Sequence, residues 1–186
     1  STGLLNDTFE FSGRLSKIDS DGYVDRAYSD LKSYFLQASF QKGNTFLKAL
    51  SFGGHEKTYQ SWDGLTMDQV LEHRRQNPLT YENEIDNYKQ DHYQLHWKQK
   101  LNPNWSANFG LNYTYGRGYF EQFREDDSVD TYSGIVVSDI DKNGSNTGTV
   151  DLIRRRWLDN NFYVFNASFI YNKNRFNISL NSSFSK

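Results

Sequence analysis

The four histidines, His55, His73, His92 and His96, are the first side chains to consider for chemistry. His92 and His96 are four residues apart, a spacing that places two metal-ligating imidazoles on one face of a helix. The segment around them alternates like a β-strand, however, so both side chains point to its polar face, about 13 Å apart at ~3.3 Å per residue. The sequence therefore favours two histidines on a polar strand face and predicts no metal site.

Motifs for catalysis or cofactor binding are lacking elsewhere. The sequence has no phosphate-binding glycine loop and no nucleophile motif, and without cysteine it can form no disulfide or thiolate site. The stretch DKNGSNTGTVD at 141–151 offers oxygen ligands but lacks the terminal glutamate of a calcium loop, so a solvated loop is expected. We therefore expect no catalytic residue, no cofactor and no enzyme activity.

Charge gives weaker signals. The basic clusters EHRRQ at 72–76 and RRRW at 154–157 have the charge to contact an anionic ligand or lipopolysaccharide phosphates, and equally the composition of solvated loops. The net charge of −2 argues against nucleic acid as a partner.

The segment 54–87 is the strongest candidate for a binding site, because it is too long to be a simple connection. It offers three aromatic and three acidic residues, namely Tyr59, Trp62, Tyr81, Asp63, Glu82 and Glu84. Exposed aromatic rings beside acidic groups are common where loops bind a ligand. We therefore predict that Tyr59, Trp62, Asp63 and Tyr81 bind a ligand. The alternative is that the loop only packs on its neighbours.

Alternation of apolar and polar residues predicts the elements that carry these side chains. In WSANFGLNYTYGRGYFEQF, residues 105–123, apolar residues occupy one face and Ser, Asn, Gly and Thr the other. Six further segments alternate: 8–18, 30–41, 45–53, 88–101, 157–171 and 176–185. In 45–53 the phase is ambiguous, because Lys48 shares a side with Phe46, Leu50 and Phe52. The pattern predicts an all-β, antiparallel, up-and-down meander of about seven strands, with a short helix at 67–76.

The connections between these strands alternate in length. Three are tight, at 42–44, 102–104 and 172–174, and three are long, at about 19–29, 54–87 and 123–156. All tight turns then lie at one end of the meander and all long loops at the other. Several strands also reach the ~9–11 residues that cross a bilayer at a tilt. Together these features predict part of a transmembrane β-barrel.

Composition agrees with exposed apolar faces. The chain has 186 residues, of which 36% are hydrophobic and 17% aromatic, and it has no apolar run near 18 residues that would form a transmembrane helix. Trp105 begins its strand and Tyr113 lies towards the other end, as in the aromatic belts of membrane proteins. Two alternatives stay open: a soluble aromatic-rich β-domain that binds carbohydrate or another small ligand, and an eight-stranded lipocalin-like barrel. These alternatives bury Leu36, Leu95 and Leu111 in a dry core, whereas a membrane strand turns them to lipid.

Several stretches, taken in order, resemble consecutive barrel segments of a TonB-dependent outer-membrane receptor, most closely of the Bacteroidetes kind. They are GRLSKIDSDGYVDRAYSDLKSYFLQASF, EKTYQSWDG, YENEIDNYKQDHYQL, GRGYFEQF and RRRWLDNNFY. The resemblance implies a location in the bacterial outer membrane, contact with its lipid, and a barrel of 22 strands plugged by an N-terminal domain. It also implies binding of a scarce solute, such as an iron chelate, haem, cobalamin or a glycan, for TonB-driven uptake.

The chain covers only part of what a receptor of that family contains. It has no plug, no TonB-contacting segment and about a third of the strands, and NSSFSK stops inside an alternating strand. No signal peptide opens the chain at Ser1. The resemblance therefore implies that residues 1–186 form a partial barrel domain, an internal fragment whose receptor contacts TonB only through the plug region. Seven strands leave two unpaired edges, so edge-to-edge self-association is an open alternative.

Overall fold

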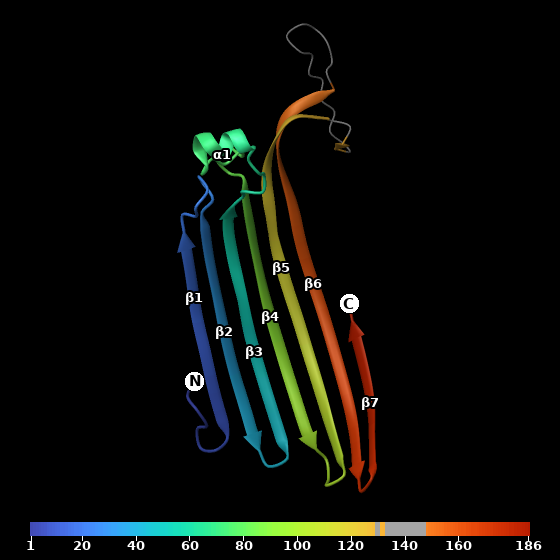
Figure 1. Cartoon of the computed structure of the whole chain (residues 1–186). Helices are drawn as coiled ribbons and strands as arrows, with labels where there is room; N and C mark the ends of the chain where they lie inside the picture. Colours follow the sequence, from blue (N-terminus) through green and yellow to red (C-terminus); the bar gives the residue numbers. More distant parts are fainter. Residues whose placement is uncertain (129–130, 133–147) are drawn as a thin grey trace.

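The computed structural model describes residues 1–128, 131–132 and 148–186, which form one antiparallel sheet of seven strands (Figure 1). The strands are β1 (Phe9–Ser20), β2 (Ser29–Lys42), β3 (Thr45–Tyr59), β4 (Ile85–Lys100), β5 (Trp105–Ser128), β6 (Thr149–Lys173) and β7 (Phe176–Ser185). Each strand pairs with its neighbour in the chain, in the order β1 to β7. The predicted seven-stranded meander is therefore confirmed. Its described part is an open sheet, with β1 and β7 at the two edges.

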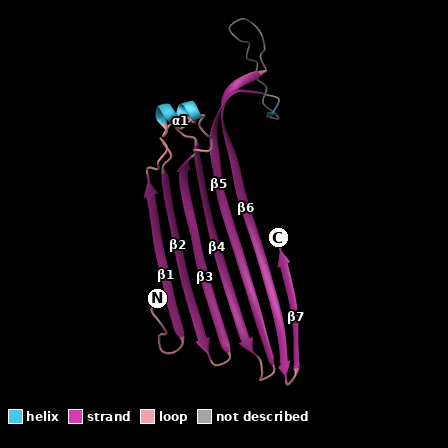
Figure 2. Ribbon diagram, in the orientation of Figure 1, coloured by secondary structure: helices cyan, strands magenta, loops and turns pink. Residues whose placement is uncertain are grey.

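Short turns lie at one end of the sheet and long connections at the other, as predicted (Figures 1 and 2). Gly43 has φ 55° and Asn174 has φ 54°, a left-handed conformation that Gly adopts freely and Asn tolerates. These residues reverse the chain between β2 and β3 and between β6 and β7.

The long connection between β3 and β4 contains the helix α1 (Met67–His73). It begins after Thr66, whose hydroxyl accepts from the Gln69 amide while the Gln69 side chain accepts from the Thr66 amide, a reciprocal capping box. The predicted helix at 67–76 is therefore present but ends three residues earlier. No helix in the described ranges is long and apolar enough to cross a membrane.

Four strands extend at least three residues further towards the long-loop end than the sequence pattern predicted. β3 runs to Tyr59, β4 starts at Ile85, and β5 and β6 rise beyond the other strands (Figure 1). These extensions carry charged residues on both faces, so the apolar alternation fades there while the backbone ladder continues. A bulge between Arg124 and Asp127 interrupts the β5–β6 register. The calcium-like stretch lies largely outside the described residues, at 141–147.

The strand register collects the apolar residues on one face of the sheet, the apolar face, and the histidines His92 and His96 on the other, the polar face. Leu95, Leu111 and Phe165 are directly opposite one another on β4, β5 and β6. Leu95 and Leu111 keep 44% and 50% of their surface exposed. In the described part of the chain, nothing covers this face as the dry core of a soluble domain would be covered.

Aromatic side chains form cross-strand rows near both ends of the exposed apolar face. Towards the short-turn end, the rings of Trp105 and Tyr171 lie 4.8 Å apart. Towards the long-loop end, Tyr113 stacks between Tyr93 and Tyr163, at 6.0 and 4.7 Å. Eight residues separate Trp105 from Tyr113, about 27 Å along the strand at ~3.4 Å per residue. At the ~35–45° tilt of barrel strands this length spans about 20 Å of bilayer, most of the ~25 Å apolar band of membrane barrels.

Candidate ligand-binding rim

Asn77 joins the two long connections of the described chain, the first loop (residues 21–28) and the rim loop (residues 60–84). Asn77 is only 1% exposed. Its Nδ2 donates to the carbonyls of Asp25 (3.1 Å) and Gln60 (3.0 Å), and its Oδ1 accepts from the Leu79 amide (3.0 Å). Arg26 donates from Nη2 to the carbonyls of Asn77 and Leu79, at 2.9 and 2.7 Å. These bonds fix the rim loop against the first loop.

The basic cluster at 72–76 takes part in the same contact. The Arg75 Nε donates to the Tyr23 carbonyl (2.8 Å), and the Arg75 carbonyl accepts from the Asp25 amide (2.7 Å). The Arg75 guanidinium also lies 5.6 Å from the centre of the Tyr23 ring. Arg75 therefore serves to hold α1 on the first loop.

Two of the four predicted ligand-binding residues hold the rim loop on the sheet. Tyr59 is buried, and its hydroxyl lies 3.0 Å from the Leu79 carbonyl and 2.7 Å from the Tyr81 carbonyl. The Tyr81 hydroxyl donates to Oε1 of the buried Glu121 (2.6 Å), and this bond raises the pKa of the Tyr81 phenol. On the other side Glu121 accepts from Arg155. Both tyrosines are therefore engaged within the protein.

The other two predicted residues, Trp62 and Asp63, lie exposed at the surface of the rim. Trp62 is 61% exposed, and its ring meets the Phe120 ring edge-on with centroids 5.7 Å apart. The Arg156 guanidinium lies 5.4 Å from the centre of the same Phe120 ring. Asp63 is exposed in the next position of the chain. We call Trp62, Asp63, Phe120 and Arg156 the rim site.

Sequence reasoning missed Phe120 as a member of this site, and it named Arg156 only as part of the basic cluster at 154–157. Phe120 lies on the polar face, where β5 is otherwise mostly polar, and it is directly opposite Arg156 of β6. The signal in the sequence was that Phe120 is an aromatic residue at a position where the alternation predicts a polar one. The register then places it opposite the arginines at 154–156. Only the strand register brings these two positions together. The rim site therefore offers an aromatic surface flanked by one positive and one negative group.

A buried carboxyl group lies behind the rim site. Glu84 is buried, and its Oε2 accepts from the Phe123 amide at 3.3 Å. Burial raises the pKa of Glu84, and the nearby charges of Asp63 and Glu121 raise it further. The rim loop therefore ends on an acid whose pKa is raised above that of a solvated glutamate.

We expect the rim loop to loosen as the pH rises. Because the folded chain holds the Glu84 proton more tightly than the unfolded chain, stability falls as the pH rises above the ordinary pKa of 4.5 and through the raised value. Glu84→Gln mimics the protonated form and should remove this dependence. Amide protection factors of residues 60–84, measured at about pH 5 and pH 8, check it. A Glu84→Gln chain with the same pH dependence as the original would contradict this role.

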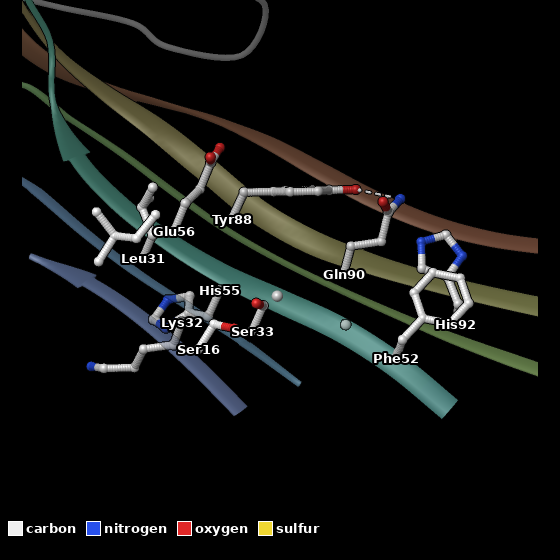
Figure 3. Close-up of a pocket in the computed structure, with 13 residues that line it drawn as sticks. Ser16, Leu31, Lys32, Ser33, Phe52, His55, Glu56, Tyr88, Gln90 and His92 are labelled. Carbon is white, nitrogen blue, oxygen red and sulfur yellow. Dashed lines mark hydrogen bonds between the residues drawn. The ribbon is translucent and has the colours of Figure 1, made fainter. Parts of the chain in front are cut away.

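The polar face is hollowed beside the rim, between β1 and β4. Figure 3 shows this concavity, of about 490 Å³, with Phe52 and His92 lying against each other and Tyr88 and Gln90 beyond them. The Phe52 and His92 rings stack at 4.6 Å, and the His92 Nδ1 lies 2.9 Å from the Thr114 hydroxyl. His92 thus has polar and aromatic partners. Among the described residues, no group of three or more acidic or histidine side chains could hold a metal ion.

Comparison with known proteins supports the fold. No family model matches the sequence, and a search of curated proteins finds no match. Among solved structures, the chain is similar to the ferric-catecholate import receptor Fiu from E. coli K12, at 10% sequence identity. The closed form aligns with a TM-score of 0.61 over 98% of this chain and 28% of the receptor. The open form gives 0.63 over 98% and 30%. The chain thus spans less than a third of that receptor, and the likeness concerns the fold alone.

Proposed function

We propose that residues 1–186 form part of the barrel wall of a TonB-dependent receptor in the bacterial outer membrane. The observation that carries this proposal is the uncovered apolar face, where leucines such as Leu95 and Leu111 stay half exposed between two aromatic rows. Lipid is the environment that stabilises such a face, and the polar face then lines the barrel interior. The likeness to a receptor of known fold supports this interpretation.

The receptor of which this chain forms part binds a scarce solute for TonB-driven uptake and carries out no catalysis. A small ferric chelate is favoured, because the similar structures are of a ferric-catecholate import receptor. Haem, cobalamin and glycans are the other classes of solute that the receptor could bind. In this receptor the plug, the TonB contacts and the remaining strands lie outside residues 1–186. Those remaining strands pair with the sheet edges β1 and β7, so the edges do not pair with a second copy of the chain. The narrower assignment to receptors of the Bacteroidetes kind rests on the sequence resemblance alone.

Within this proposal the rim site contacts the solute, and the two tyrosines position it. Trp62 and Asp63 are exposed beside Phe120 and Arg156 at the long-loop end, where the barrel opens outward. Tyr59 and Tyr81 hold the rim loop from beneath through their hydroxyl groups. A large exposed aromatic ring next to a cation suits a planar, charged solute.

Trp62→Ala should weaken solute binding by roughly tenfold, the usual cost of losing an aromatic anchor. The test is uptake and equilibrium binding of a radiolabelled ferric catecholate by cells that carry the intact receptor. The matched control is Trp157→Ala, which removes an exposed tryptophan from the apolar face near the same end. Receptor abundance should be unchanged in both variants. Equal binding by the original and the Trp62→Ala receptor would remove Trp62 from the site.

A further inference from the structure

A row of basic side chains crosses the apolar face just beyond the aromatic row of Tyr93, Tyr113 and Tyr163, towards the long-loop end. The register places Lys17 opposite Lys32, Lys32 opposite His55, His55 opposite Lys89 and Lys89 opposite Arg117. Five neighbouring strands thus each contribute one basic residue at the same level. On β4 this level lies four residues past Tyr93, towards the long loops. We call Lys17, Lys32, His55, Lys89 and Arg117 the cationic row.

Two pairs in the cationic row are like charges directly opposite each other, Lys17 with Lys32 and Lys89 with Arg117. Such pairs destabilise a sheet. Each of these four cations has one carboxylate partner, at 2.8–3.6 Å. One carboxylate leaves donors of each ammonium or guanidinium group free, because lysine has three N–H donors and arginine five. The row can therefore accept a further anion, which would also reduce the repulsion between the opposed cations.

At the centre of the row the cations are more exposed than their acidic partners. The Lys89 side chain is 62% exposed, whereas that of Asp91, 3.1 Å away, is 9% exposed. Asp91 is held from the other side by the Tyr34 hydroxyl, which donates to its Oδ1 at 2.9 Å. Lys32 is likewise more exposed than Asp30. At the centre of the cationic row, the lysine ammonium groups are therefore more accessible from solvent than the aspartates that pair with them.

A hollow of about 310 Å³ lies at this centre, with Lys32, His55 and Lys89 among its lining residues. Beside it, Gly53 of β3 lets the Tyr34 and Asp91 side chains approach each other, because a Cβ on Gly53 would lie 2.5 Å from the Asp91 Oδ1. The hollow also has an apolar wall at Leu15, which is exposed. The hollow is thus lined by the lysines of the cationic row and, on another side, by the apolar side chain of Leu15.

We propose that the cationic row binds the phosphorylated headgroup of a lipid in the leaflet at the long-loop end. This inference rests on the proposed membrane location. The lysine ammonium groups donate to phosphate oxygens, and an acyl chain runs from the hollow over Leu15 and Leu36. The headgroup bridges cations that otherwise repel one another. The row is thereby a binding site for one chemical class of lipid, separate from the rim site on the opposite face.

The test uses the 186-residue chain in a nonionic maltoside detergent, offered equal amounts of bisphosphorylated lipid A and the same lipid without phosphates. Native mass spectrometry counts the lipids retained. The variant Lys17→Gln, Lys32→Gln, Lys89→Gln shortens each side chain by one atom, keeps a polar end group and removes three charges. The matched control, Lys48→Gln, Lys98→Gln, Lys100→Gln, removes the same charge from the polar face, and circular dichroism confirms the sheet in each.

We expect selective retention of the phosphorylated lipid, weakened about tenfold or more in the row variant and unchanged in the control. Equal retention of both lipids, or equal loss in both variants, would overturn the proposal. Complete displacement by excess inorganic phosphate would overturn it too, because the row would then recognise the free ion. A chain that binds neither lipid nor detergent and folds in plain buffer would instead contradict the membrane location, so the two failures are distinguishable.

Discussion

Leu111→Arg should destabilise the chain in a lipid bilayer by up to roughly 2–4 kcal/mol, the cost of a basic residue at the midplane of a barrel's lipid face. Leu111 lies inside the apolar band of β5, between Trp105 and Tyr113, directly opposite Leu95 and Phe165. Half of its surface is exposed, so lipid is its main surrounding in this account. The guanidinium has no carboxylate within its cross-strand neighbours to offset the loss of water.

The measurement is a reversible urea titration of the chain in phosphatidylcholine vesicles, followed by tryptophan fluorescence. Asn166→Arg is the control, because Asn166 is exposed at the same depth on the polar face, opposite Gly110. It should change the free energy of unfolding by less than about 1 kcal/mol. Equal destabilisation by both substitutions would show that the two faces do not differ in environment. Destabilisation of a chain that folds without detergent or lipid would indicate a soluble core.

Asn77→Ala should release the rim loop from the first loop. The substitution leaves the buried carbonyl of Gln60, and the partly buried carbonyl of Asp25 and amide of Leu79, without this partner. Each buried polar group left unpaired costs about 1–3 kcal/mol. The loss falls on loop contacts alone, because Asn77 takes no part in the strand ladder. Hydrogen exchange of residues 21–28 and 60–84 should therefore accelerate, while exchange in β2 to β5 stays slow.

The control for this change is Gln76→Ala, which removes an exposed amide side chain from the adjacent position. Its exchange should match that of the original chain. In the intact receptor, Asn77→Ala should also weaken solute binding, because Trp62 and Asp63 lose their fixed position. Unchanged loop exchange in Asn77→Ala would mean that the two loops are held together by other contacts.

The strands were predictable because a sheet with one apolar face imposes a period of two on the sequence. Where the phase was ambiguous, in β3, neighbouring strands decide it. Leu47 faces Phe40 and Trp97 on the apolar face, which places Phe46, Lys48 and Phe52 on the polar face. Phe52 is accommodated there by stacking on His92. No local pattern within β3 contains that information.

The candidate site was less predictable, because its arrangement depends on contacts between distant residues. Asn77 bonds to Asp25, 52 positions earlier, and nothing near Asn77 in the sequence distinguishes it from other loop asparagines. Tyr59 and Trp62 are both aromatic and three positions apart, yet one is buried and the other exposed. The difference arises because β3 continues through Tyr59, beyond the end of the apolar alternation.

A nitroxide scan along β5 shows whether the apolar face of the sheet meets lipid. Single spin labels at residues 107 to 117 of the chain in lipid vesicles report access to oxygen, which concentrates in lipid, and to a water-soluble nickel complex. We expect oxygen access to alternate with a period of two, highest at Phe109 and Leu111, and nickel access to dominate at Arg117. Phe109 and Leu111 shielded from both reagents would place them in a dry core and contradict the account.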